Sequence, residues 1–157
     1  DIHIVENENF ESTNVVRSLS LGLKAATKDN LLVVYGDLVF EESLVPNIVT
    51  PRSTCLVVSN KVFDDEREVG VLLQSGKVVN FSYGLPDKWG QITFLTGKEK
   101  DLFVKMVHSR DNVNLFGFEV LNAIVDRGGE FQAYHPEEVN IVEIDQSQDL
   151  VRAQKIK

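Results

Sequence analysis

Apolar runs and amphipathic stretches alternate along the chain, which predicts strands and helices in turn. The clearest run is Leu-Leu-Val-Val-Tyr at residues 31–35, and its β-branched content is typical of a strand buried on both faces of a parallel sheet. Ser75 and Gly76 predict a tight hairpin turn between two shorter runs. Strands are predicted at residues 2–5, 31–35, 54–60, 69–73, 77–82, 90–95, 130–135 and 139–144.

Apolar residues that recur every three or four positions predict the helices. We expect Asn14 or Thr13 to cap the first helix, Asn114 to cap the third, and the glycine pair at 128–129 to end the third. Because strands alternate with helices, the fold class is expected to be α/β and layered, with an antiparallel or mixed middle section. The predicted helices are 14–28, 98–108, 114–127 and 147–156.

Length and composition indicate one globular unit, so we expect a single domain over residues 1–157. Hydrophobic residues make up 43% of the chain and charged residues 25%, as in ordinary globular domains. The net charge of −8 argues against nucleic acid or an anionic membrane as a partner, and an acidic protein that handles phosphates needs a metal. A single cysteine and no bilayer-length apolar run favour a cytoplasmic location.

Two aspartates follow predicted strands and are candidate metal ligands. Asp37 comes directly after Gly36 at the end of the 31–35 run, where open α/β sheets bind ligands; alternatively it caps the next turn. Asp145 ends the last strand, where it equally suits the N-cap of the final helix. Alternation along that strand places Glu143 on the same face as Asp145. As a pair, Asp37 and Asp145 suffice for Mg²⁺, which prefers carboxylate oxygens.

Four stretches together resemble the later two-thirds of the sugar-phosphate and choline-phosphate nucleotidyltransferases, which have a GT-A-like fold. One is a turn and helix containing Thr-Asn-Val-Val-Arg-Ser-Leu, and a second is the strand that ends in Gly-Asp. A third begins at Lys-Trp-Gly-Gln, and the fourth is the closing Val-Glu-Ile-Asp-Gln-Ser-Gln-Asp-Leu. They occupy residues 4–19, 31–40, 88–103 and 142–156.

The resemblance implies a three-layer Rossmann-like mixed sheet flanked by helices and incomplete at the N-terminus. It also implies a reaction in which an acceptor phosphate oxygen attacks the α-phosphate of an NTP in line and pyrophosphate leaves. The acceptor would be a sugar 1-phosphate or a phosphocholine-like molecule, and a homo-oligomer is left open. The implied roles are Mg²⁺ binding by Asp37 and Asp145, nucleotide binding by Asn14 and Gly36, and acceptor binding by Tyr83, Trp89 and Glu143.

Several of these roles compete with structural ones, and the chain departs from the family pattern. Asn14 suits a helix cap, and Trp89 suits ordinary core packing. The family's glycine-rich Gly-x-Gly-x-Arg loop is missing from the sequence, and Gln91 stands where an acid is usual. Enzymatic activity is therefore open, and the alternative is a truncated or non-catalytic homologue that serves as a binding or assembly module. A receiver-type phosphoacceptor domain using Asp37 is disfavoured, because the chain has no further acid pair on an earlier strand.

Overall fold

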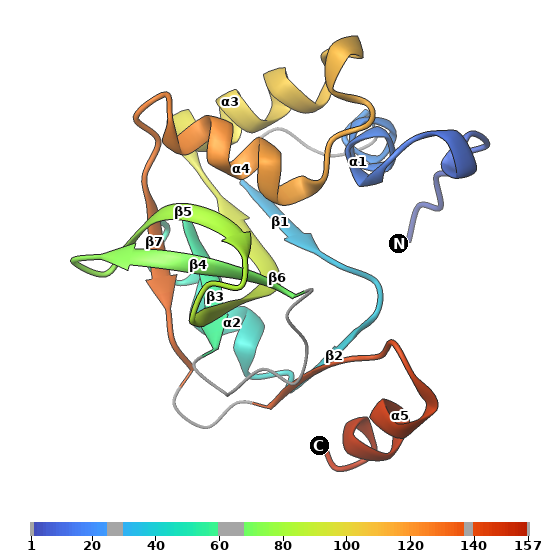
Figure 1. Cartoon of the computed structure of the whole chain (residues 1–157), viewed down its shortest axis with the longest axis vertical. Coiled ribbons are helices and arrows are strands. Elements are labelled where there is room, and N and C mark those ends of the chain that lie inside the picture. Colours follow the sequence, from blue (N-terminus) through green and yellow to red (C-terminus); the bar gives the residue numbers. More distant parts are fainter. Residues whose placement is uncertain (1, 25–29, 60–67, 137–139, 157) are drawn as a thin grey trace.

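The computed structural model describes residues 2–24, 30–59, 68–136 and 140–156. A mixed sheet lies at its centre, with α1, α3 and α4 on one face and α2 on the other, as Figure 1 shows. The six strands of this sheet are β1 (Leu31–Val34), β3 (Cys55–Ser59), β4 (Val69–Gln74), β5 (Lys77–Tyr83), β6 (Asp87–Leu95) and β7 (Phe131–Tyr134). A two-stranded sheet is formed by β2 (Leu38–Phe40) and β8 (Ile141–Glu143). The predicted α/β fold class with a mixed sheet is confirmed.

The helices are mostly short; α1 precedes the first described strand, and the others follow strands. They are α1 (Val15–Gly22), α2 (Leu44–Val49), α3 (Gly97–Val107), α4 (Gly117–Val125) and α5 (Ser147–Ala153), with 3₁₀ turns η1 (Phe10–Ser12) and η2 (Arg110–Asn112). None of the helices in the described part of the chain is both long enough and apolar enough to cross a membrane.

The strand pairings close on themselves. The order is β1-β6-β3-β7-β5-β4, and β4 pairs a second time with β6, so five strands form a ring of neighbours. Only the β3–β7 pair is parallel among the described pairings of this sheet. The β4–β5 hairpin turns at Ser75 and Gly76, which both have positive φ (52° and 77°), as the predicted tight turn requires.

The expectation for residues 31–35 is partly wrong. β1 pairs antiparallel with β6, and among the described strands it has no second neighbour, so it is an edge strand rather than a central parallel one. Its apolar composition nevertheless has a physical cause, because both faces contact apolar layers. Leu31 and Val33 pack against one hydrophobic cluster and Leu32 against the other.

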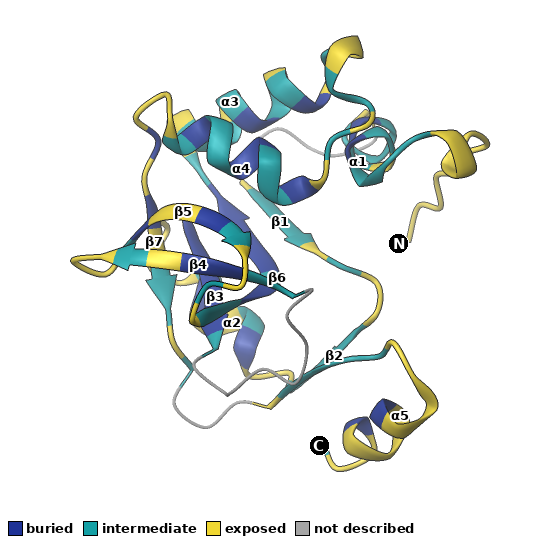
Figure 2. Cartoon of the chain, in the orientation of Figure 1, coloured by how far each residue is buried: buried dark blue, intermediate teal, exposed yellow. Residues whose placement is uncertain are grey.

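The two clusters occupy the two faces of the sheet, and the dark blue segments of Figure 2 mark the buried residues that form them. The larger cluster lies under α1, α3 and α4 and includes Phe81, Trp89 and Phe131. The smaller lies under α2 and consists of Leu44, Ile48, Cys55, Val57, Ile92 and Phe94. This arrangement confirms a three-layer architecture.

Asn122 joins α4 to β5 by pairing with one residue of the strand. Its side-chain amide donates to the Phe81 carbonyl at 2.7 Å, and its oxygen accepts from the Phe81 N–H at 2.8 Å. β7 pairs with β5 only at Lys77 and Val78, so the Asn122 amide takes the place of a neighbouring strand further along. The bond pair fixes β5, near its end, against the middle of α4.

Several predicted elements differ from the structure. Residues 2–5 do not form a strand, and Ile2 and Ile4 are almost fully exposed, because no described strand lies beside them. The third helix begins at Gly117 with Phe116 as its N-cap, not after Asn114. The first helix is assigned only to Gly22, while predicted positions 25–29, 60 and 139 lie outside the described residues. β2 and α2 were not predicted, because elements of three and six residues are too short to show a period.

Candidate functional site

A cleft of about 640 Å³ opens beside the end of β1, between the start of α4 and the turn that joins β8 to α5. Six of the seven residues proposed from the sequence as site residues line this cleft. The seventh, Gly36, precedes the cleft residue Asp37 in the chain. The six are Asn14, Asp37, Tyr83, Trp89, Glu143 and Asp145.

Three carboxylates meet at one end of the cleft because β2 pairs with β8. Leu38 lies opposite Glu143 in that pairing, and the Ile144 N–H donates to the Asp37 carbonyl at 2.9 Å. One carboxylate oxygen from each of Asp37, Glu143 and Asp145 lies within 4.8 Å of the others. The sequence placed Asp37 and Asp145 at strand ends, and the short β2–β8 sheet is what brings them together.

The structure separates the acids from their alternative capping roles. The final helix has Gln146 as its N-cap, and the Asp149 carboxylate accepts the N–H groups of Asp145 at 3.3 Å and Gln146 at 2.9 Å. Asp145 is therefore not the helix cap, and its own carboxylate faces the other two acids. At Asp37 it is the backbone carbonyl, not the side chain, that accepts the described hydrogen bond, and the donor is Ile144 beside the β2–β8 pair.

Mutual repulsion is visible in the electrostatics of the cluster. The Glu143 charge, burial, and the charges of Asp37 and Asp149 raise the pKa of Asp145, against a smaller opposing effect of Lys88. A cation among the three carboxylates would relieve this repulsion. An all-oxygen, all-carboxylate donor set suits a hard ion such as Mg²⁺, so the residues fit the metal that the sequence implied.

Lys88 connects the acid cluster to the main sheet. Its ammonium lies 3.1 Å from a Glu143 carboxylate oxygen and 2.5 Å from one of Glu68, and all three side chains are mostly buried. Burial lowers the pKa of Lys88, but the bonds to Glu68 and Glu143 outweigh it, so the pKa of Lys88 lies above its usual value. Lys88 therefore stays charged and holds Glu143 in place.

Asn14 caps α1, as predicted. Its side-chain oxygen accepts from the Val15 N–H at 2.8 Å, and its own N–H donates to the Val113 carbonyl at 3.0 Å. These bonds tie the start of α1 to the segment before α4, so that Asn14 reaches the cleft from a fixed position.

The predicted aromatic residues differ in their surroundings. Trp89 is 4% exposed and belongs to the core, where its ring makes edge contacts with Tyr35 at 5.6 Å and Phe81 at 5.8 Å. Its indole N–H donates to the Thr93 hydroxyl at 3.2 Å. Core packing therefore accounts for Trp89, which contributes only to the cleft wall. Tyr83, in contrast, is 49% exposed.

Sequence reasoning missed two phenylalanines that continue the aromatic wall. Phe118 makes an edge contact with Tyr83 at 5.4 Å, and Phe116 stacks on Phe118 at 5.9 Å and 20° between ring planes. All three rings line the cleft. Phe118 lies within the predicted helix 114–127, where an apolar residue fits the buried face. The signal that could have found the pair is an aromatic residue on each side of Gly117 at the helix start.

Two backbone features lie beside the acids. Gln91 has φ of 55° within β6, where the register against β3 shifts, and its carbonyl accepts from the Tyr35 N–H at 3.4 Å. A left-handed residue in a bulge directs its side chain out of the regular alternation, and Gln91 lines the cleft. Gly36 has an ordinary φ and a Cβ there would meet nothing within 4 Å, so no described neighbour requires glycine at this position.

Comparisons with known proteins bear on the fold. No family model matches the chain, and no curated protein sequence matches it. Among solved structures it is similar to the inositol-1-phosphate CTP transferase from T. maritima, with a TM-score of 0.71, 19% identity and coverage of 92% of this chain and 60% of that one. A second similar structure is a protein assigned as a glucose-1-phosphate thymidylyltransferase from Bacillus anthracis, in complex with sucrose. The TM-score is 0.76 and the identity 14%, and the match covers 97% of this chain and 63% of that one.

A third similar structure is the CTP:phosphocholine cytidylyltransferase from Streptococcus pneumoniae, with a TM-score of 0.68, 16% identity and coverage of 95% of this chain and 66% of that one. The chain thus spans about three-fifths of the length of these structures. It has the mixed α/β fold of the sugar-phosphate and choline-phosphate nucleotidyltransferases and covers part of that fold.

Proposed function

We propose that this chain provides the metal-binding and acceptor-binding part of a Mg²⁺-dependent nucleotidyltransferase. The reaction would transfer a nucleoside monophosphate from an NTP to a sugar 1-phosphate or a phosphocholine-like acceptor, with release of pyrophosphate. The observation that carries the proposal is the meeting of Asp37, Glu143 and Asp145 in one cleft of a chain with this fold.

Each proposed residue has a distinct part. Asp37 and Asp145 would hold Mg²⁺, which when bound supplies positive charge against the phosphates of the NTP. Lys88 keeps Glu143 fixed beside them, so that the cluster needs little rearrangement to accept the ion. Asn14 fixes the loop on the nucleotide side, where its cap bond limits its movement.

Gly36 and the aromatic side chains complete the proposed site. Because the Cα of Gly36 faces open space, a phosphate could approach the backbone beside Asp37. Tyr83 would contact the acceptor, with Trp89 behind it as part of the rigid wall.

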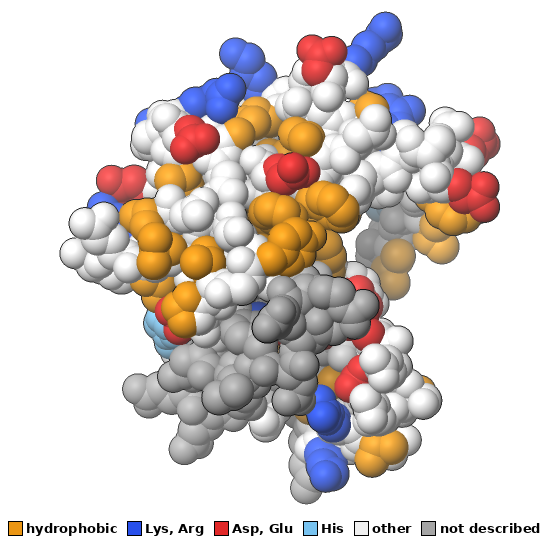
Figure 3. All heavy atoms as spheres, in the orientation of Figure 1, with side chains coloured by type: hydrophobic (Ala, Val, Ile, Leu, Met, Phe, Trp, Pro, Cys, Tyr) orange, Lys and Arg blue, Asp and Glu red, His pale blue; other side chains and the backbone are white. Residues whose placement is uncertain are grey.

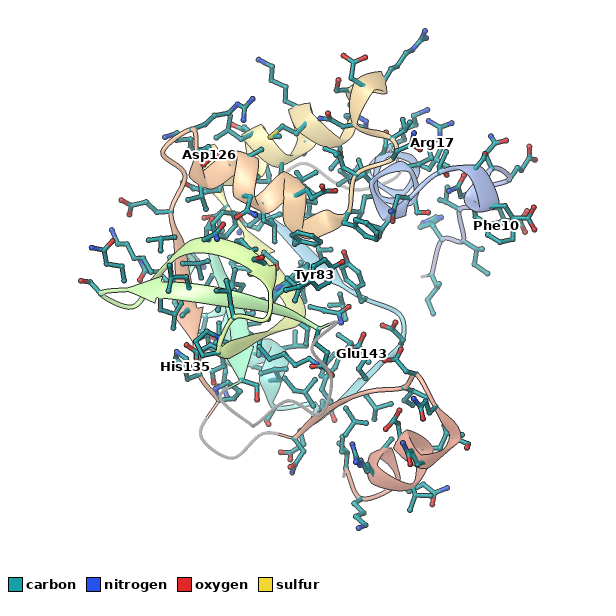
Figure 4. The ribbon with its side chains drawn as sticks, in the orientation of Figure 1. Phe10, Arg17, Tyr83, Asp126, His135 and Glu143 are labelled. Atoms are coloured by element: carbon teal, nitrogen blue, oxygen red, sulfur yellow. The ribbon has the colours of Figure 1, made fainter. Side chains whose placement is uncertain are left out.

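The test is a titration of the chain with Mg²⁺ and a panel of NTPs, followed by thermal unfolding. We expect a rise in the unfolding temperature that needs both metal and nucleotide and is lost in Asp37→Asn and Asp145→Asn. Asp126→Asn is the matched control, since Asp126 is exposed at the end of α4, far from the acids in Figure 4. The absence of any Mg²⁺-dependent shift in the wild type would overturn the proposal.

A second candidate is a non-catalytic module that keeps the fold and binds without turnover. The Gly-x-Gly-x-Arg loop of the family pattern is not among these 157 residues, so binding and turnover are tested separately. Pyrophosphate release in the presence of Mg²⁺, NTP and acceptor separates the two: release that stops in Asp37→Asn identifies the enzyme. Mg²⁺–NTP binding without any release identifies the module.

A further inference from the structure

We propose that Tyr83, Phe116 and Phe118 form an aromatic shelf that binds an organic cation, the quaternary ammonium head group of a zwitterionic acceptor. The proposal rests on the proposed function, because it assigns the shelf to the acceptor of that reaction. Of the two acceptor types in the proposed function, the sugar 1-phosphate and the phosphocholine-like molecule, it selects the one that carries a positive charge at the end away from its phosphate.

The shelf is built from two elements that are locked together. Tyr83 ends β5, and Phe116 and Phe118 lie at the start of α4. The two bonds between Asn122 and Phe81 hold these elements in register, two residues from Tyr83 on the strand and one helical turn from Phe118. The rings are therefore positioned before any ligand arrives, which reduces the entropy cost of binding.

The rings are also exposed to the cleft. Tyr83 is 49% exposed and Phe116 is 48% exposed, whereas aromatic residues of the adjacent core, such as Phe81 and Trp89, are buried. Exposed aromatic rings that stack in a cleft are typical of binding surfaces. Figure 3 shows hydrophobic side chains gathered on this face next to acidic ones, and Figure 4 shows Tyr83 above Glu143.

Charge decides which ligand suits such a surface. Four carboxylates line the cleft, from Asp37, Glu68, Glu143 and Asp145, and Lys88 is the cation paired with two of them. These five groups leave three negative charges, and a divalent metal at the acids would still leave one. Aromatic faces attract cations through their quadrupole, so both the rings and the remaining charge favour a positive head group.

The experiment uses choline as the probe, without metal or nucleotide, and compares it with 3,3-dimethylbutan-1-ol, a neutral molecule of the same shape. Saturation-transfer NMR and calorimetry report binding to the whole chain. We expect choline to bind roughly 5–30-fold more tightly than the neutral isostere, the range that corresponds to a partly desolvated cation–π contact. Equal binding of the two molecules would overturn the proposal.

Variants locate the contact. Phe116→Leu and Phe118→Leu keep an apolar side chain but remove the ring, and each is expected to reduce choline binding several-fold. Phe10→Leu is the matched control, because Phe10 is 69% exposed in η1 and does not line the cleft. Unchanged unfolding temperatures show that the variants fold. Choline binding that survives both cleft substitutions would place the site elsewhere and refute the shelf.

The outcome is separable from that of the proposed function. Choline binding that depends on Phe116 and Phe118, without any Mg²⁺–NTP effect, would support the shelf and reject the transferase. If the experiments support both the aromatic shelf and the transferase activity, phosphocholine should compete with choline at the shelf, and glucose 1-phosphate should not. Displacement of choline by glucose 1-phosphate at equal concentration would overturn the selectivity for a cation.

Discussion

The bond pair between Asn122 and Phe81 gives a measurable prediction about what holds the cleft wall together. Asn122→Ala removes both hydrogen bonds at once, and Phe81 is only 2% exposed, so its N–H and carbonyl lose their partner in a largely buried position. A buried backbone group left without a partner costs about 1–3 kcal/mol, and water entering beside the half-buried Asn122 offsets part of this. We therefore expect a loss of about 2–4 kcal/mol in the free energy of unfolding.

Urea denaturation followed by circular dichroism measures this loss. The midpoint should fall with an unchanged slope, since the same surface is exposed on unfolding. For a domain of this size, the unfolding temperature should fall by roughly 2–4 °C for each kcal/mol. Asn80→Ala is the matched control, because Asn80 lies exposed on the same strand, and its effect should stay within about 0.5 kcal/mol. If Asn122→Ala lowers the free energy of unfolding no more than Asn80→Ala does, the Asn122 amide does not replace the hydrogen bonds of a neighbouring strand.

Three further predictions concern packing, charge and pH. Gly70→Ala should destabilise the fold by about 2 kcal/mol or more, because the new Cβ would lie 2.5 Å from the Leu85 carbonyl oxygen; Gly36→Ala, in open space, should leave the urea midpoint within experimental error of wild type. Lys88→Met should cost about 1–3 kcal/mol by leaving two mostly buried glutamates unpaired, and Lys88→Arg should restore part of it in the same denaturation assay; a loss no larger in Met than in Arg would contradict the ion-pair argument. The raised pKa of Asp145 means that its protonated form is favoured in the folded state, so its contribution to stability is full below the ordinary aspartyl pKa and is lost as the pH rises through the raised value. Asp145→Asn should therefore be more stable than the metal-free wild type above that window and equal to it below, and a difference that does not change with pH would show that repulsion is not the cause.

The sequence was sufficient for the features that depend on local pattern. The run ending at Asp37 and the strand ending near Asp145 were visible as apolar segments followed by an acid, and strand alternation placed Glu143 with Asp145. The cap at Asn14 and the turn at residues 75–76 follow from side-chain chemistry within a few residues.

Features that depend on tertiary neighbours could not be predicted in this way. The β2–β8 pairing joins segments about a hundred residues apart through strands of three residues, too short for a period to show. Likewise, Phe118 satisfies a helical apolar pattern whether it enters the core or faces a cleft, and the difference depends on where β5 ends. The partners of β1 also follow from the arrangement of the whole sheet, not from its own composition.

The position of the acids on the small sheet has a consequence for local unfolding. Asp37 precedes β2 and Asp145 follows β8, and this two-stranded sheet lies outside the ring of strands that forms the body of the fold. Opening of β2 from β8 would separate the carboxylates while the ring stays intact, so the cluster belongs to a unit of low local stability. The amide hydrogen of Ile144, bonded to the Asp37 carbonyl, reports that opening through its exchange with solvent. A cation held by the acids would slow this exchange, because the rate falls in proportion to the fraction of molecules that have no cation bound. The exchange rate of this amide therefore reports metal affinity even for a metal without a spectroscopic signal.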